Sequence, residues 1–163
     1  MINELKIGEI GEEYILNKLK CSSEIRTIID VRDNEIYREK DIDFILIDKN
    51  YRIIFLECKT DTKIHSTRNI AYEVYSSYEL INGKEKSTLG CFEKTESDFI
   101  IYCSLYNDKI DEIFVFNTKK LQEYYKNNKE KYTVRPTGVD KGHSVLIPLG
   151  FITGNEIGYK YKN

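Results

Sequence analysis

Two short apolar stretches carry the residues whose types and spacing most clearly predict chemistry. Asp43 opens the first stretch, and Glu57 and Lys59 close the second one after a polar turn. Side chains alternate between the faces of a β-strand, so Glu57 and Lys59 share a face. A turn centred at residue 50 pairs Ile47 with Ile53. The same register places Asp43 opposite Glu57, with about 4.5–5.5 Å between their Cβ atoms.

Two carboxylates at this separation repel each other and are costly to bury unless a cation binds between them. Their hard oxygen atoms favour Mg²⁺ or Mn²⁺ over zinc. A simpler interpretation is that Asp43 and Glu57 are solvated strand ends. However, residues 53–56 are apolar on both faces. This pattern indicates a buried central strand whose polar end opens into a cleft. We therefore expect the two carboxylates to hold a divalent cation.

A predicted helix over residues 4–20 supplies further carboxylates. One stripe at helical spacing carries Glu12 among apolar residues and a glycine: Leu5, Gly8, Glu12, Ile15 and Leu19. A carboxylate on a packing face needs a partner, so Glu12 is the expected third acidic residue of the site. Glu13 and Glu9 are the alternatives. All three could instead only favour the first half of the helix electrostatically.

Gly8 and Gly11 lower the helix propensity of this segment. A glycine inside a helix is usually compensated by the close approach of another element. We expect that element to be the predicted sheet.

This constellation resembles the PD-(D/E)XK nuclease superfamily, which includes restriction endonucleases and archaeal-type Holliday junction resolvases. The resemblance lies within residues 1–75 and rests on Asp43, on the Glu57-Cys58-Lys59 run, and on the Gly-Glu-Ile-Gly-Glu-Glu helix of residues 8–13. Ile42 stands where the family usually has a proline, which is the least constrained element of its signature.

The resemblance implies an α/β fold of the restriction endonuclease type, a three-layer sandwich with a central mixed β-sheet flanked by helices. We expect one such domain over residues 1–163, with residues 77–98 as a candidate insertion. A second, weaker resemblance to small endonuclease-like proteins of phages rests on this same segment.

The resemblance also implies hydrolysis of phosphodiester bonds with Mg²⁺ or Mn²⁺. Asp43, Glu57 and the backbone carbonyl of Cys58 would hold the metal, with Glu12 near it. Lys59 would stabilise charge on the scissile phosphate, or orient or deprotonate the attacking water. An amine is protonated near pH 7, and two adjacent carboxylates oppose the lower pKa that a base needs. We therefore favour electrostatic stabilisation by Lys59.

The polar stretch after Lys59 predicts substrate contacts. Lys63 and Arg68 lie in this stretch, and cations that follow a catalytic strand suit phosphate groups. Glu73, on the next predicted strand, is a further candidate for the same cleft. Asp41, two residues before Asp43, could be a second ligand or could contact solvent, and we favour solvent.

The amino-acid composition limits the possible substrates only in part. A net charge of −2, from 25 basic and 27 acidic residues, is not typical of a dedicated nucleic-acid binder, although a nuclease needs only a local basic patch. No helix-turn-helix or zinc-finger pattern is visible, which favours a DNA endonuclease of low or structure-dependent specificity. The alternatives are an RNA-directed nuclease and a nuclease-fold nucleic-acid-binding or inhibitor protein with little catalysis. The sequence does not distinguish a monomer from a homodimer.

The expected location is the cytoplasm. No apolar run approaches the roughly 20 residues that span a bilayer, so no membrane partner is expected, and no secretory signal is visible. None of the four cysteines forms a C-x-x-C pair, and we expect reduced thiols. A phage-encoded protein would act in a bacterial cytoplasm.

The remaining patterns predict the elements around the site. Polar residues 34–41 indicate a loop, and residues 158–163 a loosely held tail. Thr118 is the expected N-cap of a helix over 118–130. Further strands are predicted over 24–31, 69–76, 99–104, 112–117 and 145–149, with another short strand near Val134.

Overall fold

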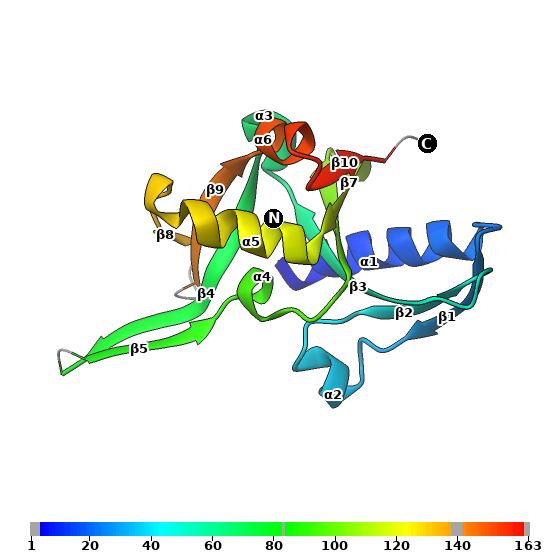
Figure 1. Cartoon of the computed structure of the whole chain (residues 1–163), viewed down its shortest axis with the longest axis horizontal. Helices are drawn as coiled ribbons and strands as arrows, with labels where there is room; N and C mark the ends of the chain where they lie inside the picture. Colours follow the sequence, from blue (N-terminus) through cyan, green and yellow to red (C-terminus); the bar gives the residue numbers. More distant parts are fainter. Residues whose placement is uncertain (1–3, 83, 138–141, 162–163) are drawn as a thin grey trace.

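A mixed six-stranded β-sheet forms the centre of the molecule (Figure 1). The computed structural model describes residues 4–82, 84–137 and 142–161. The central sheet has the order β1-β2-β3-β6-β7-β10. Its strands are β1 (Ile25–Asp30), β2 (Phe44–Asp48), β3 (Ile53–Asp61), β6 (Phe99–Tyr106), β7 (Lys109–Asn117) and β10 (Gly158–Lys160). The strands β3 and β6 are parallel, and all other neighbours are antiparallel. The predicted mixed sheet is therefore confirmed.

The register of β2 and β3 is the one that the sequence predicts. Ile47 lies opposite Ile53, and Phe44 lies opposite Leu56. The N–H of Asp43 donates to the carbonyl of Leu56 over 2.8 Å, so the pairing continues one residue beyond the start of β2.

One face of this sheet is covered by α1 (Glu4–Lys20), whose bounds match the predicted helix. Ile15 and Leu16 of the helix are buried against an apolar layer from four strands: Phe44, Leu46, Leu56, Cys58, Ile101, Cys103, Ile113 and Val115. A Cβ atom on Gly11 would overlap the side chain of Thr60 on β3, so α1 approaches the sheet closely there. The expected reason for a glycine is confirmed for Gly11. A Cβ atom on Gly8 would meet only the Glu12 carboxylate, at 3.6 Å.

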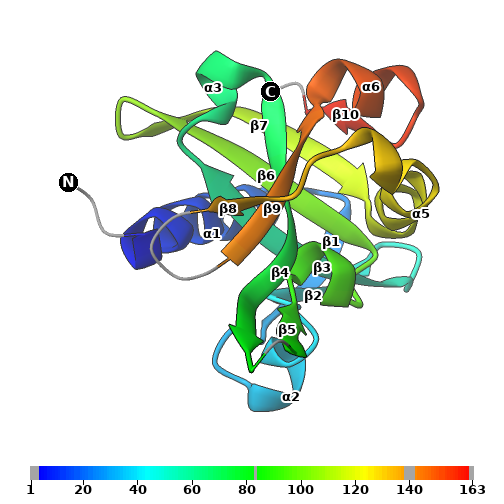
Figure 2. The ribbon, with the colours of Figure 1, turned by 90° about the vertical axis from the view of Figure 1, so that its left-hand side faces the viewer.

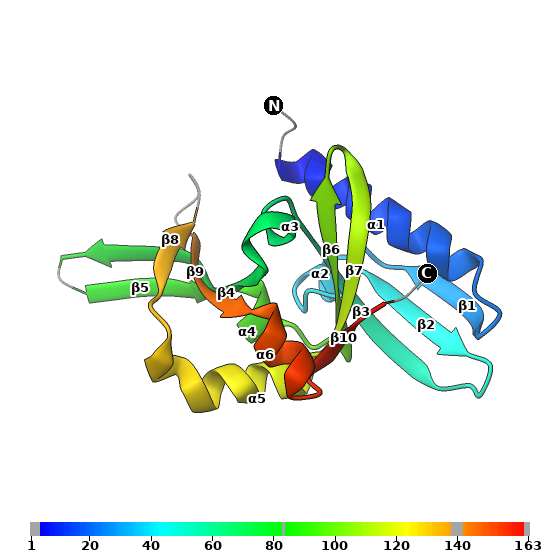
Figure 3. The same cartoon turned by 90° about the horizontal axis from the view of Figure 1, so that it is seen from above.

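The opposite face of β6 and β7 packs on a second, four-stranded antiparallel sheet with the order β5-β4-β9-β8 (Figures 2 and 3). Its strands are β4 (Asn69–Ile81), β5 (Lys84–Leu89), β8 (Arg135–Thr137) and β9 (Gly142–Pro148). Three helices complete this layer: α4 (Cys91–Lys94), α5 (Thr118–Asn128) and α6 (Leu149–Gly154). The second sheet was not predicted. It replaces much of the expected helical layer on this side.

Several boundaries differ from the predictions, because capping and strand pairing rather than the polarity of the residues decide them. The expected loop at 34–41 contains the one-turn helix α2 (Glu35–Arg38), whose N-cap Asn34 accepts the N–H of Ile36. The expected loop after Lys59 is partly β3 and the short helix α3 (Ile64–Thr67). The strand that begins at Asn69 continues past residue 76, because β5 pairs with it as a hairpin.

The C-terminal part of the chain is also more ordered than expected. The N-cap of α5 is Asn117, whose side chain accepts the N–H of Lys120 over 3.0 Å, whereas Thr118 is buried. A 3₁₀ turn, η1 (Lys129–Lys131), follows α5. The predicted loose tail instead includes β10, which pairs with β7 at the edge of the central sheet. Within the described ranges, no helix has the length and apolarity to cross a bilayer.

The contact between α1 and β3 predicts opposite effects for two glycine substitutions. Gly11→Ala should lower the free energy of unfolding by about 1–3 kcal/mol, because the new methyl group overlaps Thr60. Gly8→Ala should leave stability unchanged or raise it by up to about 1 kcal/mol through helix propensity. Urea unfolding of both variants checks this pair. Equal stabilities would show that α1 does not pack on β3 as described.

Candidate metal centre and its cleft

The ends of β2 and β3 open into a cleft of about 870 Å³ that α1 borders on one side. Asp43 directly precedes β2, and the register of the strand pair places it opposite Glu57. Lys59 follows on the same face of β3. The carboxylates that line the cleft are Glu9, Glu12, Glu13, Asp33, Asp41, Asp43 and Glu57. The structure thus gathers Asp43, Glu57 and the helix carboxylates around one space, whereas Glu73, a further candidate for this cleft, lines a neighbouring hollow instead.

Asp43 is half-buried, and its Oδ2 accepts the backbone N–H of Cys58 over 2.7 Å. Burial and the negative charge of Glu57 raise the pKa of Asp43 to about 8, and Glu12 contributes in the same direction. The hydrogen bond from Cys58 and the charge of Lys59 offset only part of this effect.

Glu57 is only 3% exposed. Its Oε1 lies 2.7 Å from the Lys59 Nζ. Burial raises the pKa of Glu57, although the ammonium of Lys59 opposes that shift. The Lys59 ammonium balances Glu57, whereas Asp43, with a pKa of about 8, keeps its proton near pH 7, so ionising both carboxylates would require a further cation.

Burial alone would lower the pKa of Lys59. The charge and the hydrogen bond of Glu57 oppose burial and raise this pKa above its usual range. The amine of Lys59 is therefore charged at neutral pH. This agrees with the preference for electrostatic stabilisation over a general-base role.

The donor set fits a hard divalent cation. Asp43 and Glu57 offer carboxylate oxygens, and a cation near them would remove the repulsion that raises their pKa values. The side chain of Cys58 points into the apolar layer under α1. Burial raises the pKa of its thiol well above the usual value, so it supplies no thiolate. Only the backbone carbonyl of Cys58 stays available as a ligand from this residue.

Among the three helix carboxylates, Glu12 lies deepest. Its side chain is 24% exposed, compared with 57% for Glu13. Glu9 also lines the cleft but is exposed. Glu12 is the one of the three whose charge raises the pKa of Asp43. The geometry therefore favours Glu12 as the residue nearest to Asp43.

Arg32 lines this cleft and was missed by the sequence analysis. Its guanidinium lies 3.1 Å from Glu12, 2.8 Å from Glu13 and 2.6 Å from Asp30. It also lies over the ring of Phe44, 5.2 Å from the centroid. A single arginine after a strand matches no sequence motif that would mark it as functional. Only its proximity to α1 in space reveals that it holds the helix carboxylates.

Asp41 corrects a second expectation. We favoured contact with solvent, but its side chain is 19% exposed and lies 3.1 Å from Lys94. Its charge also raises the pKa of Glu57. Asp41 therefore belongs to the acidic cleft. Its positive φ of 47° turns the chain immediately before β2.

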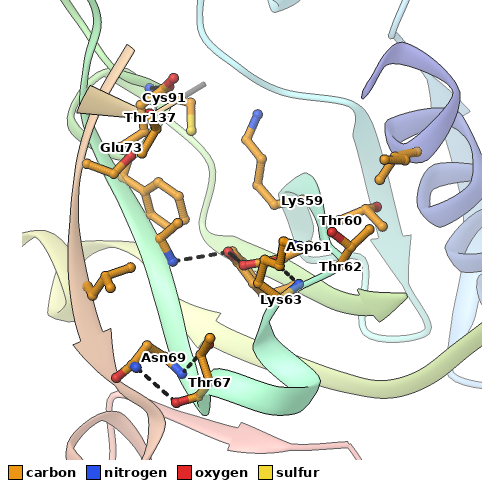
Figure 4. Close-up of a pocket in the computed structure, with 16 residues that line it drawn as sticks. Lys59, Thr60, Asp61, Thr62, Lys63, Thr67, Asn69, Glu73, Cys91 and Thr137 are labelled. Carbon is orange, nitrogen blue, oxygen red and sulfur yellow. Dashed lines mark hydrogen bonds between the residues drawn. The ribbon is translucent and has the colours of Figure 1, made fainter. Parts of the chain in front are cut away.

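The two expected substrate contacts are separated in the structure. Lys63 is exposed and lines a neighbouring hollow that also includes Lys59 and Glu73 (Figure 4). Arg68 instead pairs with Glu112 and lies over Phe114, 5.8 Å from the ring centroid. It lines a different surface hollow, which α6 and β10 border.

His65, Asp111 and Glu112 form a separate cluster with metal-ligating atoms close together. His65 Nδ1 lies 2.6 Å from Asp111 Oδ2. Glu112 is paired with both Arg68 and Lys160. These partners already balance the charge of the cluster, so we assign no metal to it.

Comparisons with known proteins do not name a relative: no protein-family model matches the chain, and no curated protein does.

The raised pKa of Asp43 predicts a pH-dependent loss of stability in the metal-free protein. Between about pH 4 and 8, the folded state keeps a proton that the unfolded state has released, so stability falls as pH rises. Asp43→Asn removes this titration. The variant should therefore gain stability relative to wild type between pH 5 and pH 8, by an amount on the order of 2 kcal/mol. Urea unfolding in EDTA measures the gain, with Asp108→Asn in an exposed turn as the control. A constant difference across this range would contradict the strained carboxylate pair.

Proposed function

We propose that this chain is a metal-dependent nuclease of the PD-(D/E)XK type that hydrolyses phosphodiester bonds. The observation that carries the proposal is the opposition of Asp43 and Glu57 across β2 and β3, with the Lys59 ammonium 2.7 Å from Glu57. Buried like charges at this position cost stability without a cation. Residues with a purely structural role would not need two buried carboxylates to face each other.

The topology around these residues supports the same proposal. A helix precedes three antiparallel strands, and the third of these pairs in parallel with a later strand. The acidic residues lie on the second and third strands and on the helix, which is the order expected from the resemblance. The four-stranded second sheet is an addition to the three-layer sandwich that the resemblance implies.

In this mechanism, Asp43, Glu57 and the Cys58 carbonyl would hold Mg²⁺ or Mn²⁺, with Glu12 close by. A bound divalent cation would lower the pKa of a water molecule and neutralise developing charge on the phosphate. Lys59 contributes a fixed positive charge beside the scissile phosphate. Arg32 holds Glu12 at the edge of the cleft through their ion pair.

DNA is the favoured substrate, acted on with low or structure-dependent specificity. The second candidate is a nucleic-acid-binding protein of the same fold with little catalysis. Incubating supercoiled plasmid, single-stranded DNA and RNA with Mg²⁺, Mn²⁺ or EDTA separates these candidates. Metal-dependent cleavage supports the nuclease. Absence of cleavage with every substrate and metal would overturn it.

Calorimetry with Mn²⁺ tests the cation site directly. Wild-type protein should give a binding isotherm that Asp43→Ala and Glu57→Ala both abolish, because each removes a carboxylate ligand. Glu12→Gln should weaken binding more than Glu9→Gln, its matched control on the exposed side of α1. The assignment of the site fails if all variants bind Mn²⁺ like the wild type.

Lys59→Met tests catalysis separately from binding. Methionine keeps most of the length and the apolar stem but leaves the buried Glu57 without its ammonium, so the thermal midpoint should fall, and thermal melting checks that the variant still folds. Metal-dependent nicking should slow by about 10²–10³, the usual cost of losing one stabiliser of transition-state charge. DNA affinity in Ca²⁺ should change far less, since one phosphate contact is a small part of binding.

The control is Lys49→Met, in the turn at the other end of the same strand pair, where Lys49 contacts only the exposed Glu24 in a surface ion pair. It should leave nicking unchanged. A wild type that cuts nothing, together with a Lys59→Met variant that loses only affinity, would favour the binding protein instead.

A further inference from the structure

A second hollow, of about 660 Å³, adjoins the acidic cleft, and Lys59 lines both spaces (Figure 4). This volume falls in the range of about 300–1,000 Å³ that small ligands occupy. The hollow lies between the end of β3 and one face of the second sheet. On that sheet, Ala71 lies opposite Leu146, and Glu73 lies opposite Ser144. All four residues line the hollow.

The two carboxylates in this hollow are already engaged by its walls. Asp61 accepts the hydroxyl of Tyr102 over 2.7 Å and the backbone N–H of Lys63. Glu73 accepts the N–H of Cys91 over 2.8 Å. Tyr102 is buried, and its hydroxyl also accepts the N–H of Ala71, so it joins β3 and β6 to the second sheet. The acids therefore hold the walls together.

Lys59 and Lys63 bring two positive charges to the hollow, and these offset the negative charges that Asp61 and Glu73 keep because their hydrogen-bond donors are neutral. The ammonium of Lys59 has three N–H donors, and Glu57 accepts one of them. The side chain extends from β3 towards the side of the hollow where Cys91 lies (Figure 4). Lys63 is exposed at the rim. Thr62 and Thr67 also line the hollow and add hydroxyl groups to its surface.

The wall formed by the second sheet has an apolar part beside Glu73 and Ser144. Ala71 and Leu146 are neighbours on its two paired strands, and Phe92 and Ile7 also line the hollow. Leu146 is 51% exposed, which leaves a large apolar side chain partly uncovered at this wall. An apolar wall opposite a cation suits a ligand with one flat apolar part and one anionic part.

We propose that the second hollow holds one unpaired nucleotide, with its base against Ala71 and Leu146 and its phosphate at Lys59. A base inside a duplex is stacked and paired, and enters such a pocket only after leaving the helix. The substrate class is therefore single-stranded or locally unpaired nucleic acid. This inference rests on the proposed nuclease function, because the same lysine serves both spaces.

The test measures the affinity of labelled oligonucleotides in Ca²⁺ by fluorescence anisotropy. The probes are a single strand, the matching duplex, and the duplex with one unpaired nucleotide. Ala71→Leu fills the hollow from its wall. It should weaken single-strand binding by about tenfold, within the range for the loss of one base contact. Binding of the fully paired duplex should change by less than about twofold.

Two further variants provide a control and an alternative to Ala71→Leu. Thr88→Leu adds similar bulk on an exposed position of the same sheet and should change nothing. Leu146→Ala removes the apolar side chain from the wall at an exposed position, so it should also weaken single-strand binding and serves if Ala71→Leu does not fold. Thermal melting checks the fold of each protein.

The outcomes separate this inference from the proposed function. Weaker binding of the single strand and of the unpaired-nucleotide probe in Ala71→Leu and Leu146→Ala supports the pocket. Unchanged single-strand affinity in folded Ala71→Leu and Leu146→Ala overturns the pocket, and Mn²⁺-dependent cleavage by those variants would leave the nuclease standing. Tighter wild-type binding to the plain duplex than to the single strand also overturns it. If the wild type neither binds nor cuts any probe, both proposals fail.

Discussion

The opposition of Asp43 and Glu57 across two neighbouring strands is the constraint on which the candidate site depends. The short turn between β2 and β3 fixes their register, because both strands are apolar on both faces and alternation alone would not specify it. The fold therefore imposes the separation of the two carboxylates. The Cys58 N–H and the Lys59 ammonium compensate part of the cost. A divalent cation is the natural complement of this cleft, because it would allow both carboxylates to ionise at neutral pH.

The strand β3 can carry these residues because each of its faces meets a different layer. Leu56 and Cys58 pack beneath α1, whereas Glu57 and Lys59 face the space beside the second sheet. Polar groups on a central strand are costly unless each has a partner. The hydroxyl of Tyr102 supplies one tie between the layers, since it bonds both to the end of β3 and to β4. The site is thus held between two independent apolar cores.

Sequence reasoning succeeded where neighbours along the chain decide the structure. The α1 helix, the β2–β3 register and the close approach at Gly11 follow from local periodicity and from one short turn. It failed where remote partners decide. The three-residue strand β10 exists because β7 offers an open edge, and Arg32 gains its role only from the placement of α1. Within the site, the spacing of Asp43, Glu57 and Lys59 could be predicted from the sequence, but the shape of the second hollow could not.

The position of Lys59 between two spaces links recognition to catalysis in the proposed enzyme. In the metal-free cleft, Glu57 accepts one N–H of this ammonium and keeps it charged. When the Glu57 oxygens turn to a cation instead, the same ammonium has one more donor for a phosphate. Lysine suits this exchange because its three donors rotate freely on a flexible stem, whereas the planar fork of arginine would fix one geometry. The positive charge of Lys59, which balances Glu57 in the metal-free cleft, can thereby contact the substrate phosphate once a cation binds the carboxylates.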